Sequence, residues 1–549
     1  MMQHLILTAE QMRRCDRYTM DTVGIPSRVL MERAAKAAVT YLLTNDRAFP
    51  RRQGVTLILC GGGNNGGDGL AMARFLSDGS WGDVRRVAVC FAGRLKTDGT
   101  PDTDRMSEEC RRQFALAVAA GVTFITPDDV QAMEAHDIDV AVDALFGIGL
   151  DRPITGVAAD LLRTVRSWGC PVLAIDIPSG VDADSGAILG EAYAPATATV
   201  TMQALKRGLV LFPGASLCGD IQVCDIGISL VPVAEEQEKM FLCDDEFLRR
   251  VMPPRTRRSN KGSYGRVALL VGSEGMAGAA VLAASASLHT GAGLIDVCTP
   301  EANRVILQAR LPEAMVQVAD GQTPRHLAEH IATTASTAVV GCGLGTSDEA
   351  LARLTAWLDI WPADGMHTAV LDADALNLLS SHENLWQTSA LSARDGRIVI
   401  TPHPGEMARL CGCTTAEVTA DILGTAVCFA QKHGVVVVLK DAHTVIAAPD
   451  GTCLLCTAGH AGMATGGAGD VLAGIIGSLL SQARGRIGES LTVAEVAAAG
   501  VYLHALAGEA AASHLGEYAC TAGDLVEHIA AVTKDFSDSR TKVGFASYR

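Results

Sequence analysis

Short runs of β-branched and aliphatic residues alternate with alanine-rich stretches of helical periodicity along most of the chain. Nearly continuous apolar runs of this kind are typical of parallel β-strands that helices cover on both faces. We therefore expect an α/β fold in which this alternation occurs twice. The predicted strands are residues 55–60, 86–91, 140–143 and 172–176 in the first half, and 267–271, 338–340, 370–372, 398–400 and 435–439 in the second.

The two series of strands are separated by residues 229–265, where charged residues are dense and no strand signal appears. Pro253-Pro254 in this segment excludes a helix at that point. The chain has 549 residues, which is too many for one hydrophobic core. We expect two domains, residues 1–235 and residues 236–549, with the charged segment leading into the second.

Composition and charge narrow the class of protein. Hydrophobic residues make up 48% of the chain and charged residues 19%, which excludes disorder as the main state. The mean hydropathy of +0.23 reflects alanine, since the longest apolar stretches, residues 435–439 and 471–480, fall far short of the ~20 residues that span a bilayer. The net charge of −16 makes nucleic acids and anionic membranes unsuitable partners. Anionic small molecules remain suitable ligands where backbone amides or single lysines face them.

The cysteines and the N-terminus bear on location. The 16 cysteines show no spacing typical of a disulfide or zinc framework, and the first twenty residues lack the apolar core of a signal peptide. We expect reduced thiols and a cytoplasmic protein without a membrane segment. The alanine-rich, weakly charged helices are compatible with subunit packing, so we expect a homo-oligomer.

A glycine-rich turn, residues 61–69, directly follows the first predicted strand and precedes a helical pattern. Glycines there let the backbone approach a ligand and turn several N–H groups toward one anion. No Gly-Lys-Ser/Thr follows, so the turn is not a Walker loop, and its glycines lack dinucleotide-fingerprint spacing. The alternative is a tight strand-to-helix turn without a ligand.

Two other strand ends carry polar groups. Asp143 precedes the glycine-bearing loop 147–153, and Asp176 precedes Ser179. Each aspartate alone could simply cap a helix. Together with Asn65, however, these strand ends form an oxygen-rich set that suits a hard cation or a proton-transfer site.

The motifs GGGNNGGDG, VDALFGIGL, AIDIPSGVDADSG and TMQALKRGLVLFPGA resemble the NAD(P)HX epimerase domain of bifunctional NAD(P)H-hydrate repair enzymes, over most of residues 1–230. The resemblance implies a Rossmann-like three-layer sandwich that interconverts the R and S epimers of hydrated NADH and NADPH with a bound K⁺. It implies K⁺ ligation by Asn65, Asp143 and Ser179, and contact of Asp176 with the reacting nicotinamide end. Lys206 is a candidate electrostatic or acid–base helper, or else an exposed, solvated lysine. The implied hydrate contacts are Asn64, Asn65, Gly66, Gly67, Asp68, Gly147, Ile148, Gly149, Leu150, Asp151, Arg152 and Pro153.

In the second half, a glycine-rich loop leads into an apolar helical pattern and is expected to end at Asp470. Free N–H groups and the dipole at a helix N-terminus stabilise a phosphoryl group. A carboxylate at that point can accept a hydroxyl proton as the oxygen attacks phosphorus. The alternative is an ordinary helix N-cap, which has no need of Gly462, Gly466, Gly467 and Gly469.

The sequence GGAGD resembles the anion loop of the ribokinase-like superfamily. NKGSYGRVALLVGS, VGCGLGTS, LDADALNLL, TPHPGEMARL and GMATGGAGDVLAGII narrow the resemblance to the ADP-dependent NAD(P)HX dehydratase, from about residue 245 onward. The resemblance implies a ribokinase-like α/β domain with ADP, accompanied by Mg²⁺, as phosphoryl donor. It implies that Ala279, Gly345, His403 and Asp470 bind the hydrate. The implied nucleotide contacts are Lys440, Asp441, Ala442, His443, Thr444 and Gly469.

Some of these positions keep a second interpretation. His403 lies between two prolines and could be a structural loop histidine, while Asp372 and Asp374 either face substrate or cap the helix that follows. His289, His504 and His514 are given no role. Two departures from the family pattern, Asp441 in place of glycine and His460-Ala461 in place of Asn-Pro, bear on nucleotide geometry, because glycine tolerates a positive φ better than aspartate does.

The two resemblances together imply a repair pathway. The hydrate carries a hydroxyl at C6, which leaves poorly until Asp470 takes its proton and ADP phosphorylates the oxygen. Expulsion of phosphate then restores NADH or NADPH and leaves AMP, while the first domain converts the R epimer to the usable S epimer. Two alternatives stay open: a ribokinase-type small-molecule kinase with a separate N-terminal binding module, and a non-catalytic nucleotide sensor.

Overall fold

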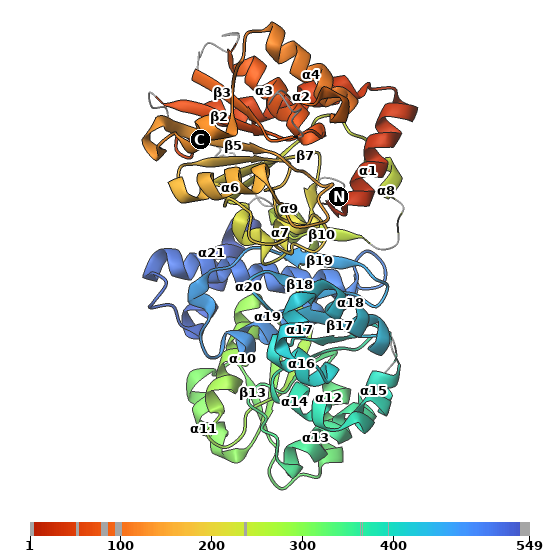
Figure 1. The fold of residues 1–549 in the computed structure, drawn as a ribbon. Helices are drawn as coiled ribbons and strands as arrows, with labels where there is room; N and C mark the ends of the chain where they lie inside the picture. The colour runs from red at the N-terminus through yellow and green to blue at the C-terminus, as the bar shows by residue number, and fades with distance from the viewer. Residues whose placement is uncertain are drawn as a thin grey trace, which may run out of the picture. The chain divides into compact units, whose positions relative to one another are not determined.

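The computed structural model describes residues 5–50, 54–77, 86–93, 101–234, 236, 239–362, 364, 366–393 and 395–538. The chain forms two compact units, unit 1 (residues 1–236) and unit 2 (residues 237–549) (Figure 1). Both are α/β units built on largely parallel sheets, so the predicted fold class is confirmed.

Unit 1 contains a sheet in which every neighbouring pair of strands is parallel. Helices α2, α3 and α4 lie on one face of this sheet and α6 on the other (Figure 1). A further short pair, β1 (Leu5–Leu7) and β8 (Leu205–Lys206), is also parallel. The strand order is β4 (Thr123–Ile125), β3 (Arg86–Phe91), β2 (Val55–Cys60), β5 (Ile138–Ala144), β6 (Val172–Ile175), β7 (Ala198–Met202) and β9 (Asp220–Cys224).

Helix α6 of unit 1 buries one apolar stripe against the sheet. In α6, Ala158, Leu161, Leu162 and Val165 pack into the cluster that includes Leu57 and Ala141 of the sheet. Strands β2 and β5 are buried along their whole length, as two-sided helical cover requires. The helices are α1 (Ala9–Tyr18), α2 (Ser27–Thr44), α3 (Asn64–Ser77), α4 (Glu108–Ala119), α5 (Pro127–Gln131), α6 (Val157–Trp168), α7 (Arg207–Val210) and α8 (Val231–Ala234).

In unit 2 the sheet is parallel except around β18, which pairs antiparallel with both of its neighbours. The strand order is β13 (Met315–Val318), β12 (Leu294–Thr299), β11 (Arg266–Leu270), β14 (Thr337–Val340), β15 (Thr368–Leu371), β16 (Ile398–Ile400), β17 (Val436–Leu439), β18 (Thr444–Ala447), β19 (Cys453–Cys456) and β10 (Met240–Leu242). The five strands predicted for this half correspond to β11, β14, β15, β16 and β17.

The prediction that residues 229–265 lack regular strand structure is wrong. Strand β10 pairs parallel with β19, and α9 (Asp245–Val251) follows it, capped by the Asp244 side chain. Three residues are too few to give a periodic signal, and pairing with β19 stabilises β10. The Pro253-Pro254 pair acts as predicted, since α9 ends at Val251.

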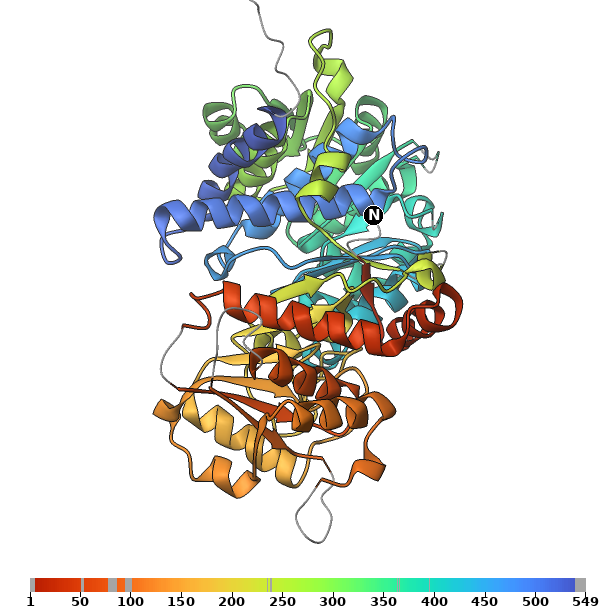
Figure 2. The ribbon, with the colours of Figure 1, turned by 90° about the horizontal axis from the view of Figure 1, so that it is seen from above.

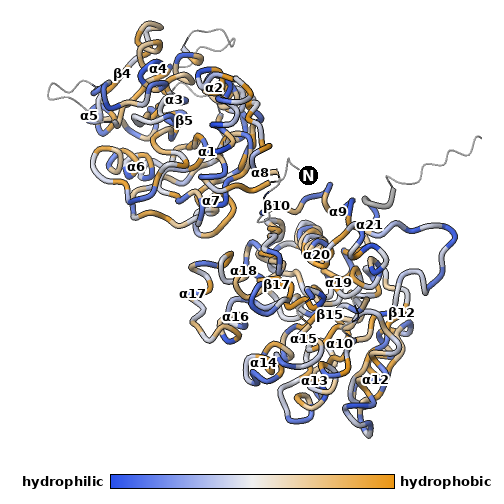
Figure 3. The backbone as a smooth tube through the Cα atoms, turned by 90° about the vertical axis from the view of Figure 1, so that its right-hand side faces the viewer, coloured by the Kyte–Doolittle hydropathy of each residue, from blue (hydrophilic) through white to orange (hydrophobic). Residues whose placement is uncertain are grey.

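Helix α19 (Ala468–Ala483) is the core element of unit 2, buried on almost every side. It packs against α10 (Ala277–Thr290), and a Cβ at Gly474 would lie 2.2 Å from the Ala283 carbonyl oxygen, so only glycine permits this approach. Helix α20 (Val493–Leu515), the long blue helix of Figure 2, packs against α19 as well. Hydrophobic residues recur through these helices (Figure 3).

The other helices of unit 2 are α11 (Glu301–Arg310), α12 (Pro324–Thr334), α13 (Asp348–Ile360), α14 (Asp374–Ser381), α15 (Ser389–Ser392), α16 (Pro404–Cys411), α17 (Thr415–Ala420), α18 (Ile422–His433) and α21 (Ala522–Asp538). Across the described part of the chain, no helix combines the length and the hydropathy that crossing a membrane requires.

Candidate active sites

A cavity of about 710 Å³ opens in unit 1 beyond the carboxyl ends of β2, β5 and β6. Its wall contains residues from α1, α3, the segment 145–150 and β8. Open α/β sheets bind ligands at this edge, so the strand ends expected to carry a site do converge. The predicted residues in its lining are Asn64, Asn65, Asp68, Gly147, Ile148, Gly149, Leu150, Asp176 and Lys206.

The glycine-rich segment differs from the predicted loop, because α3 already begins at Asn64. Gly66 lies against the preceding strand end, where a Cβ would come 1.9 Å from the Gly61 carbonyl oxygen, and a Cβ at Gly69 would come 2.6 Å from the Ala144 Cβ. These glycines allow close helix–strand packing, so the alternative of a tight strand-to-helix turn explains part of the motif. Only the start of the segment, where a Cβ at Gly63 would meet nothing within 4 Å, faces open space.

Asp143 and Ser179 form a buried pair. The Asp143 carboxylate accepts hydrogen bonds from the Ser179 hydroxyl (2.6 Å), the Ser179 N–H (2.8 Å) and the Leu145 N–H (3.2 Å). Burial raises the pKa of Asp143, and the Ser179 hydrogen bonds oppose that shift. Close by in the cavity wall, both amide atoms of Asn65 are buried without a hydrogen-bond partner among the described residues. A buried amide oxygen without a hydrogen-bond partner is available to coordinate a cation.

Lys206 and Asp176 form the second buried pair of unit 1. The Lys206 ammonium lies 2.6 Å from the Asp176 carboxylate and also donates to the Thr201 hydroxyl (2.8 Å) and the Met202 carbonyl (2.9 Å). Its side chain is 1% exposed, so the alternative of a solvated surface lysine is wrong. Asp176 has a φ of 68°, a left-handed conformation that is strained for a residue with a side chain.

Other predicted contacts of unit 1 lie outside this cavity's lining. Gly66 and Gly67 are buried in α3, while Asp151, Arg152 and Pro153 continue the loop beyond the lining residues. Sequence reasoning also missed the contribution of α1, which supplies Met12, Arg13 and Asp16. The α1 pattern is that of any amphipathic surface helix, so no signal pointed to it.

A second cavity, of about 990 Å³, opens in unit 2 at the carboxyl ends of β15, β16 and β17. The anion loop, the lysine turn and the histidine of the TPHPGE segment all reach it. Its predicted residues are His403, Lys440, Asp441, Ala442, His443, Thr444, Gly469 and Asp470. Ala279 and Gly345 are not among its lining residues: Ala279 is packed within α10, and the Gly345 N–H donates to Asp374.

Asp470 lies in the first turn of α19, so the expectation that it ends the loop is wrong. The N-cap is Gly467, with a φ of 93°, and the simple-cap alternative for Asp470 therefore fails. Burial, followed by the negative charge of Asp372, raises the pKa of Asp470 to about 6. A hydrogen bond from the Cys342 thiol and the charge of Lys440 work in the opposite direction. The carboxyl thus stands among the free N–H groups of a helix N-terminus with a pKa suited to a general base near neutrality.

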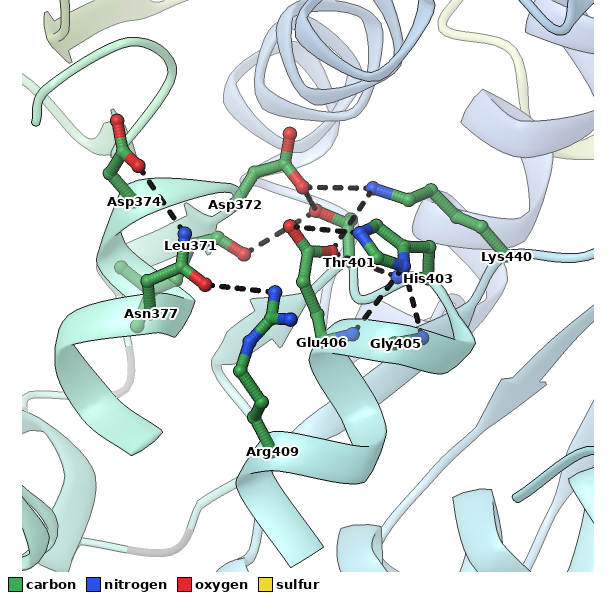
Figure 4. A network of polar contacts seen from close by, with 10 residues as sticks. All are labelled: Leu371, Asp372, Asp374, Asn377, Thr401, His403, Gly405, Glu406, Arg409 and Lys440. Atoms are coloured by element: carbon green, nitrogen blue, oxygen red, sulfur yellow. Dashed lines mark hydrogen bonds and ion pairs between the residues drawn. The ribbon is translucent and has the colours of Figure 1, made fainter. Parts of the chain in front are cut away.

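Lys440, at the start of the lysine turn, belongs to a network of polar contacts with Asp372 and Glu406 (Figure 4). The Lys440 ammonium lies 3.0 Å from Asp372 and 4.0 Å from Glu406, and Asp372 also accepts from the Thr401 hydroxyl at 2.7 Å. Burial disfavours the ammonium, but the two carboxylates outweigh it, so the pKa of Lys440 is raised. Asp372 lines the cavity and is 2% exposed, so of its two interpretations, a cavity carboxylate or a helix cap, its position fits the first. Asp374 instead accepts from the Gly345 N–H at 2.8 Å.

His403 caps a helix and also lies in the cavity lining. It is the N-cap of α16, where its Nδ1 accepts from the N–H groups of Gly405 (3.0 Å) and Glu406 (3.4 Å). The same half-exposed ring lines the cavity, with Nε2 3.6 Å from the Glu406 carboxylate. Figure 4 shows the ring beside that carboxylate.

The backbone accommodates both departures from the family pattern, Asp441 and His460-Ala461. Asp441 is not among the non-glycine residues with positive φ, which in the described ranges are Asp176, Gln203 and Ala373, so glycine is not required there. His460 caps the short helical turn after it by accepting from the Gly462 N–H at 3.1 Å. Cys342, Glu406 and His504 are site residues that sequence reasoning missed.

Each unit thus carries its own cavity at the carboxyl ends of its parallel strands, and the cavity of unit 2 is lined by a carboxyl in the first turn of a helix. A family profile described as NAD(P)H-hydrate dehydratase matches residues 267–531. One described as YjeF-related protein N-terminus matches residues 27–208.

Relatives match nearly the whole chain. The bifunctional NAD(P)H-hydrate repair enzyme Nnr of Moorella thermoacetica is 35% identical over 97% of both chains. The Nnr enzymes of Coxiella burnetii and Escherichia coli are 35% and 34% identical, over 94% and 95% of this chain and 97% and 92% of their own. The chain belongs to the bifunctional NAD(P)H-hydrate repair enzyme family, which confirms the resemblance of both halves.

Solved structures resemble part of the chain. An ADP/ATP-dependent NAD(P)H-hydrate dehydratase from Bacillus subtilis is 28% identical with a TM-score of 0.45, covering 53% of this chain and 97% of its own. A ribokinase-like superfamily protein from Enterococcus faecalis is 29% identical with a TM-score of 0.48, covering 54% of this chain and 96% of its own.

Proposed function

We propose that the chain repairs hydrated nicotinamide cofactors: unit 1 interconverts the R and S epimers of NAD(P)HX, and unit 2 dehydrates the S epimer at the expense of ADP. The observation that carries this proposal is Asp470, a carboxyl with a pKa of about 6 in the first turn of α19, facing a cavity of about 990 Å³. A dinucleotide-sized cavity, a base and an anion-binding helix end are the parts that phosphorylation of a substrate hydroxyl requires.

In unit 2, the Asp470 carboxylate takes the proton of the C6 hydroxyl as that oxygen bonds to the β-phosphorus of ADP, and the bond between phosphorus and the bridging oxygen breaks to release AMP. The N–H groups at the start of α19 stabilise the charge on the transferring group. The C6–O bond then breaks as phosphate leaves, driven by the lone pair of the ring nitrogen. Loss of a proton from C5 completes the double bond of NADH or NADPH.

The lysine turn supports nucleotide binding in the same cavity. Lys440 presents an ammonium that Asp372 and Glu406 keep protonated, which suits it to phosphate oxygens. The carboxylates of Asp372 and Glu406 fit Mg²⁺, a cation that prefers oxygen ligands and would supply charge neutralisation at the nucleotide phosphates. Asp441 to Thr444 and Gly469 complete the proposed nucleotide contacts, while His403 would contact the hydrate.

Ala279 and Gly345 are also proposed hydrate contacts, although neither lines the cavity. A Cβ at Gly343 would lie 2.8 Å from the Ala279 Cβ, and Gly343 directly follows Cys342, which donates to Asp470. A hydrate that reaches past Asp470 would therefore approach this part of unit 2.

In unit 1, Asp176, held in position by Lys206, would contact the nicotinamide end, and Asn64 to Asp68 and Gly147 to Pro153 would contact the hydrate. K⁺ fits the oxygen set of Asn65, Asp143 and Ser179, because the Asn65 amide oxygen has no partner among the described residues. Burial raises the pKa of Asp143, as expected of a carboxylate that a cation would stabilise. K⁺ would supply positive charge at the edge of the cavity.

Two proposals concern assembly and location. The exposed apolar side chains of Val305 (66%) and Ile306 (46%) on α11 support a homo-oligomer, which sedimentation of the purified chain measures. The cysteines are all free, which supports a reducing, cytoplasmic location.

The product distribution tests the function. Incubation of the purified chain with S-NADHX and ADP should yield NADH, AMP and inorganic phosphate in equal amounts. A stable phosphorylated product with no phosphate release would instead support a ribokinase-type kinase. Nucleotide binding without turnover would support a sensor.

A further inference from the structure

Two carboxyl groups of the unit 1 cavity have no chemical role in the proposed function. Asp16 lies on α1 and Asp68 on α3, and both side chains line the cavity that contains Asp176 and Lys206. Neither carboxyl takes part in a hydrogen bond within the part of the chain that the structure describes. Helix α1 also precedes the matched family segment, residues 27–208.

The Lys206 ammonium, which lines the same cavity, is already committed to other partners. The Lys206 ammonium has three N–H bonds, and Asp176, Thr201 and Met202 accept them at 2.6–2.9 Å. A lysine held in this way fixes Asp176 in position but has no N–H left for a ligand. Lys206 is therefore not available to exchange a proton with a bound hydrate, whereas the carboxyls of Asp16 and Asp68 have no such partners among the described residues.

The pKa values of Asp16 and Asp68 are both raised, but to different extents. Burial raises the pKa of Asp16 to about 6, with Lys206 lowering it and Asp176 raising it. Burial, and then the charges of Asp176 and Asp16, raise the pKa of Asp68 well above its usual range. Burial and neighbouring charge thus favour the proton on Asp68 more strongly than on Asp16, so the two cavity carboxyls are suited to act as acid and base respectively.

The remaining charged groups on α1 and its neighbours are paired with one another. Glu236 bonds to Arg14, and Glu10 lies 2.9 Å from Arg17 and 3.5 Å from Arg13. Asp184 accepts from the Ala9 N–H at the start of the helix. Asp16 is the carboxyl of α1 that faces the cavity.

We propose that Asp16 and Asp68 are the catalytic acid–base pair of the epimerisation, an inference that rests on the function proposed for unit 1. Asp68 donates its proton to the C6 hydroxyl, and the C6–O bond breaks with its electron pair leaving on water. The lone pair of the ring nitrogen stabilises the resulting cation. Water then bonds to C6 from the other face and gives its proton to Asp16. The net change is inversion at C6 with one proton moved from Asp68 to Asp16, and solvent restores both groups without an oxidant or reductant.

The test follows conversion of R-NADHX to S-NADHX by the full chain, with Asp16→Asn, Asp68→Asn and the exposed control Asp21→Asn. We expect each of the first two substitutions to slow epimerisation at least ~100-fold, as loss of a general acid or base does. Asp16→Glu should recover part of the rate, and Asp21→Asn should match the unsubstituted chain. Dehydration of S-NADHX by unit 2, measured in the same samples, should not change.

Three further readouts separate a catalytic role from a structural one. The rate for the unsubstituted chain should fall as the pH drops through about 6, and the residual rate of Asp16→Asn should lack this dependence. Epimerisation in ¹⁸O-labelled water should place label at the C6 hydroxyl. Epimerisation by Asp16→Asn at the unsubstituted rate, or inversion without label, would overturn the inference. If Asp16→Asn prevents unit 1 from folding, Asp68→Asn decides the same question. Absence of epimerisation in the unsubstituted chain would instead refute the function proposed for unit 1.

Discussion

The Lys440 ammonium lies 3.0 Å from the Asp372 carboxylate, and this buried pair adjoins the carboxyl of Asp470. The two charges act on Asp470 in opposite directions: Asp372 raises its pKa and Lys440 lowers it. Strand ends of β15 and β17 supply the pair, so the sheet itself fixes the electrostatics of the base.

Asp372→Asn removes the nearest negative charge from Asp470 and leaves Lys440 with a weaker partner. We expect the pKa of Asp470 to fall, so the acidic limb of the pH–rate profile moves to lower pH. Loss of one member of a buried ion pair should also cost about 3 kcal/mol of unfolding free energy. Rate profiles between pH 5 and 8, together with urea denaturation, measure the two effects. An acidic limb that stays at its original pH would show that Asp372 does not act on the base.

The titration of Asp470 also predicts how stability depends on pH. Its pKa is raised from 3.8 to about 6 on folding, so the native state holds this proton more tightly than the unfolded chain. The stabilisation is complete below about pH 4 and is lost as the pH rises through 6, leaving a cost on the order of 2 kcal/mol at pH 7. Asp470→Asn should therefore raise the melting temperature at pH 7 by a few degrees, about 2–5 °C, but not at pH 4. Calorimetry at both pH values measures this, and an increase of equal size at both would contradict it.

The backbone requires glycine at position 467 but not at position 466. Gly467 has a φ of 93°, and a Cβ there would lie 2.4 Å from a Leu282 methyl, whereas a Cβ at Gly466 would meet nothing within 4 Å. Gly467→Ala should lower the unfolding free energy by at least about 1 kcal/mol, while Gly466→Ala should leave it within about 0.5 kcal/mol. Denaturation of the two variants side by side makes the comparison, and equal stabilities would refute the conformational argument.

Asp176→Ala separates the two units functionally. It leaves the buried ammonium of Lys206 without its carboxylate, so unit 1 should lose its epimer exchange and melt at a lower temperature. Dehydration of S-NADHX should continue at the unsubstituted rate, because every residue of that cavity lies in unit 2. The two rates measured on one sample check this. Loss of both activities would contradict independent sites.

The residues that sequence analysis located correctly have strong local signals. Strands β2 and β3 have the predicted bounds, since long apolar runs between turns leave little choice. Asp470, Lys440 and His403 stand in motifs tied to glycine, turn or proline positions, and all three line one cavity.

The features that escaped sequence analysis depend on contacts between distant segments. Strand β10 exists because β19 pairs with it, and Asp16 belongs to the site because α1 packs beside Lys206. The packing of Gly66 escaped sequence analysis for the same reason, as Gly61 lies against Gly66 only in the folded unit. Local pattern alone does not specify such contacts.

The most direct test of the central claim is recovery of NADH from S-NADHX in the presence of ADP by the Asp470→Asn chain. The substitution keeps the size of the side chain but removes the base, so NADH formation should fall at least ~100-fold while the nucleotide still binds. NADH formation at the unsubstituted rate would contradict the assignment of Asp470 and, with it, the proposed dehydration mechanism.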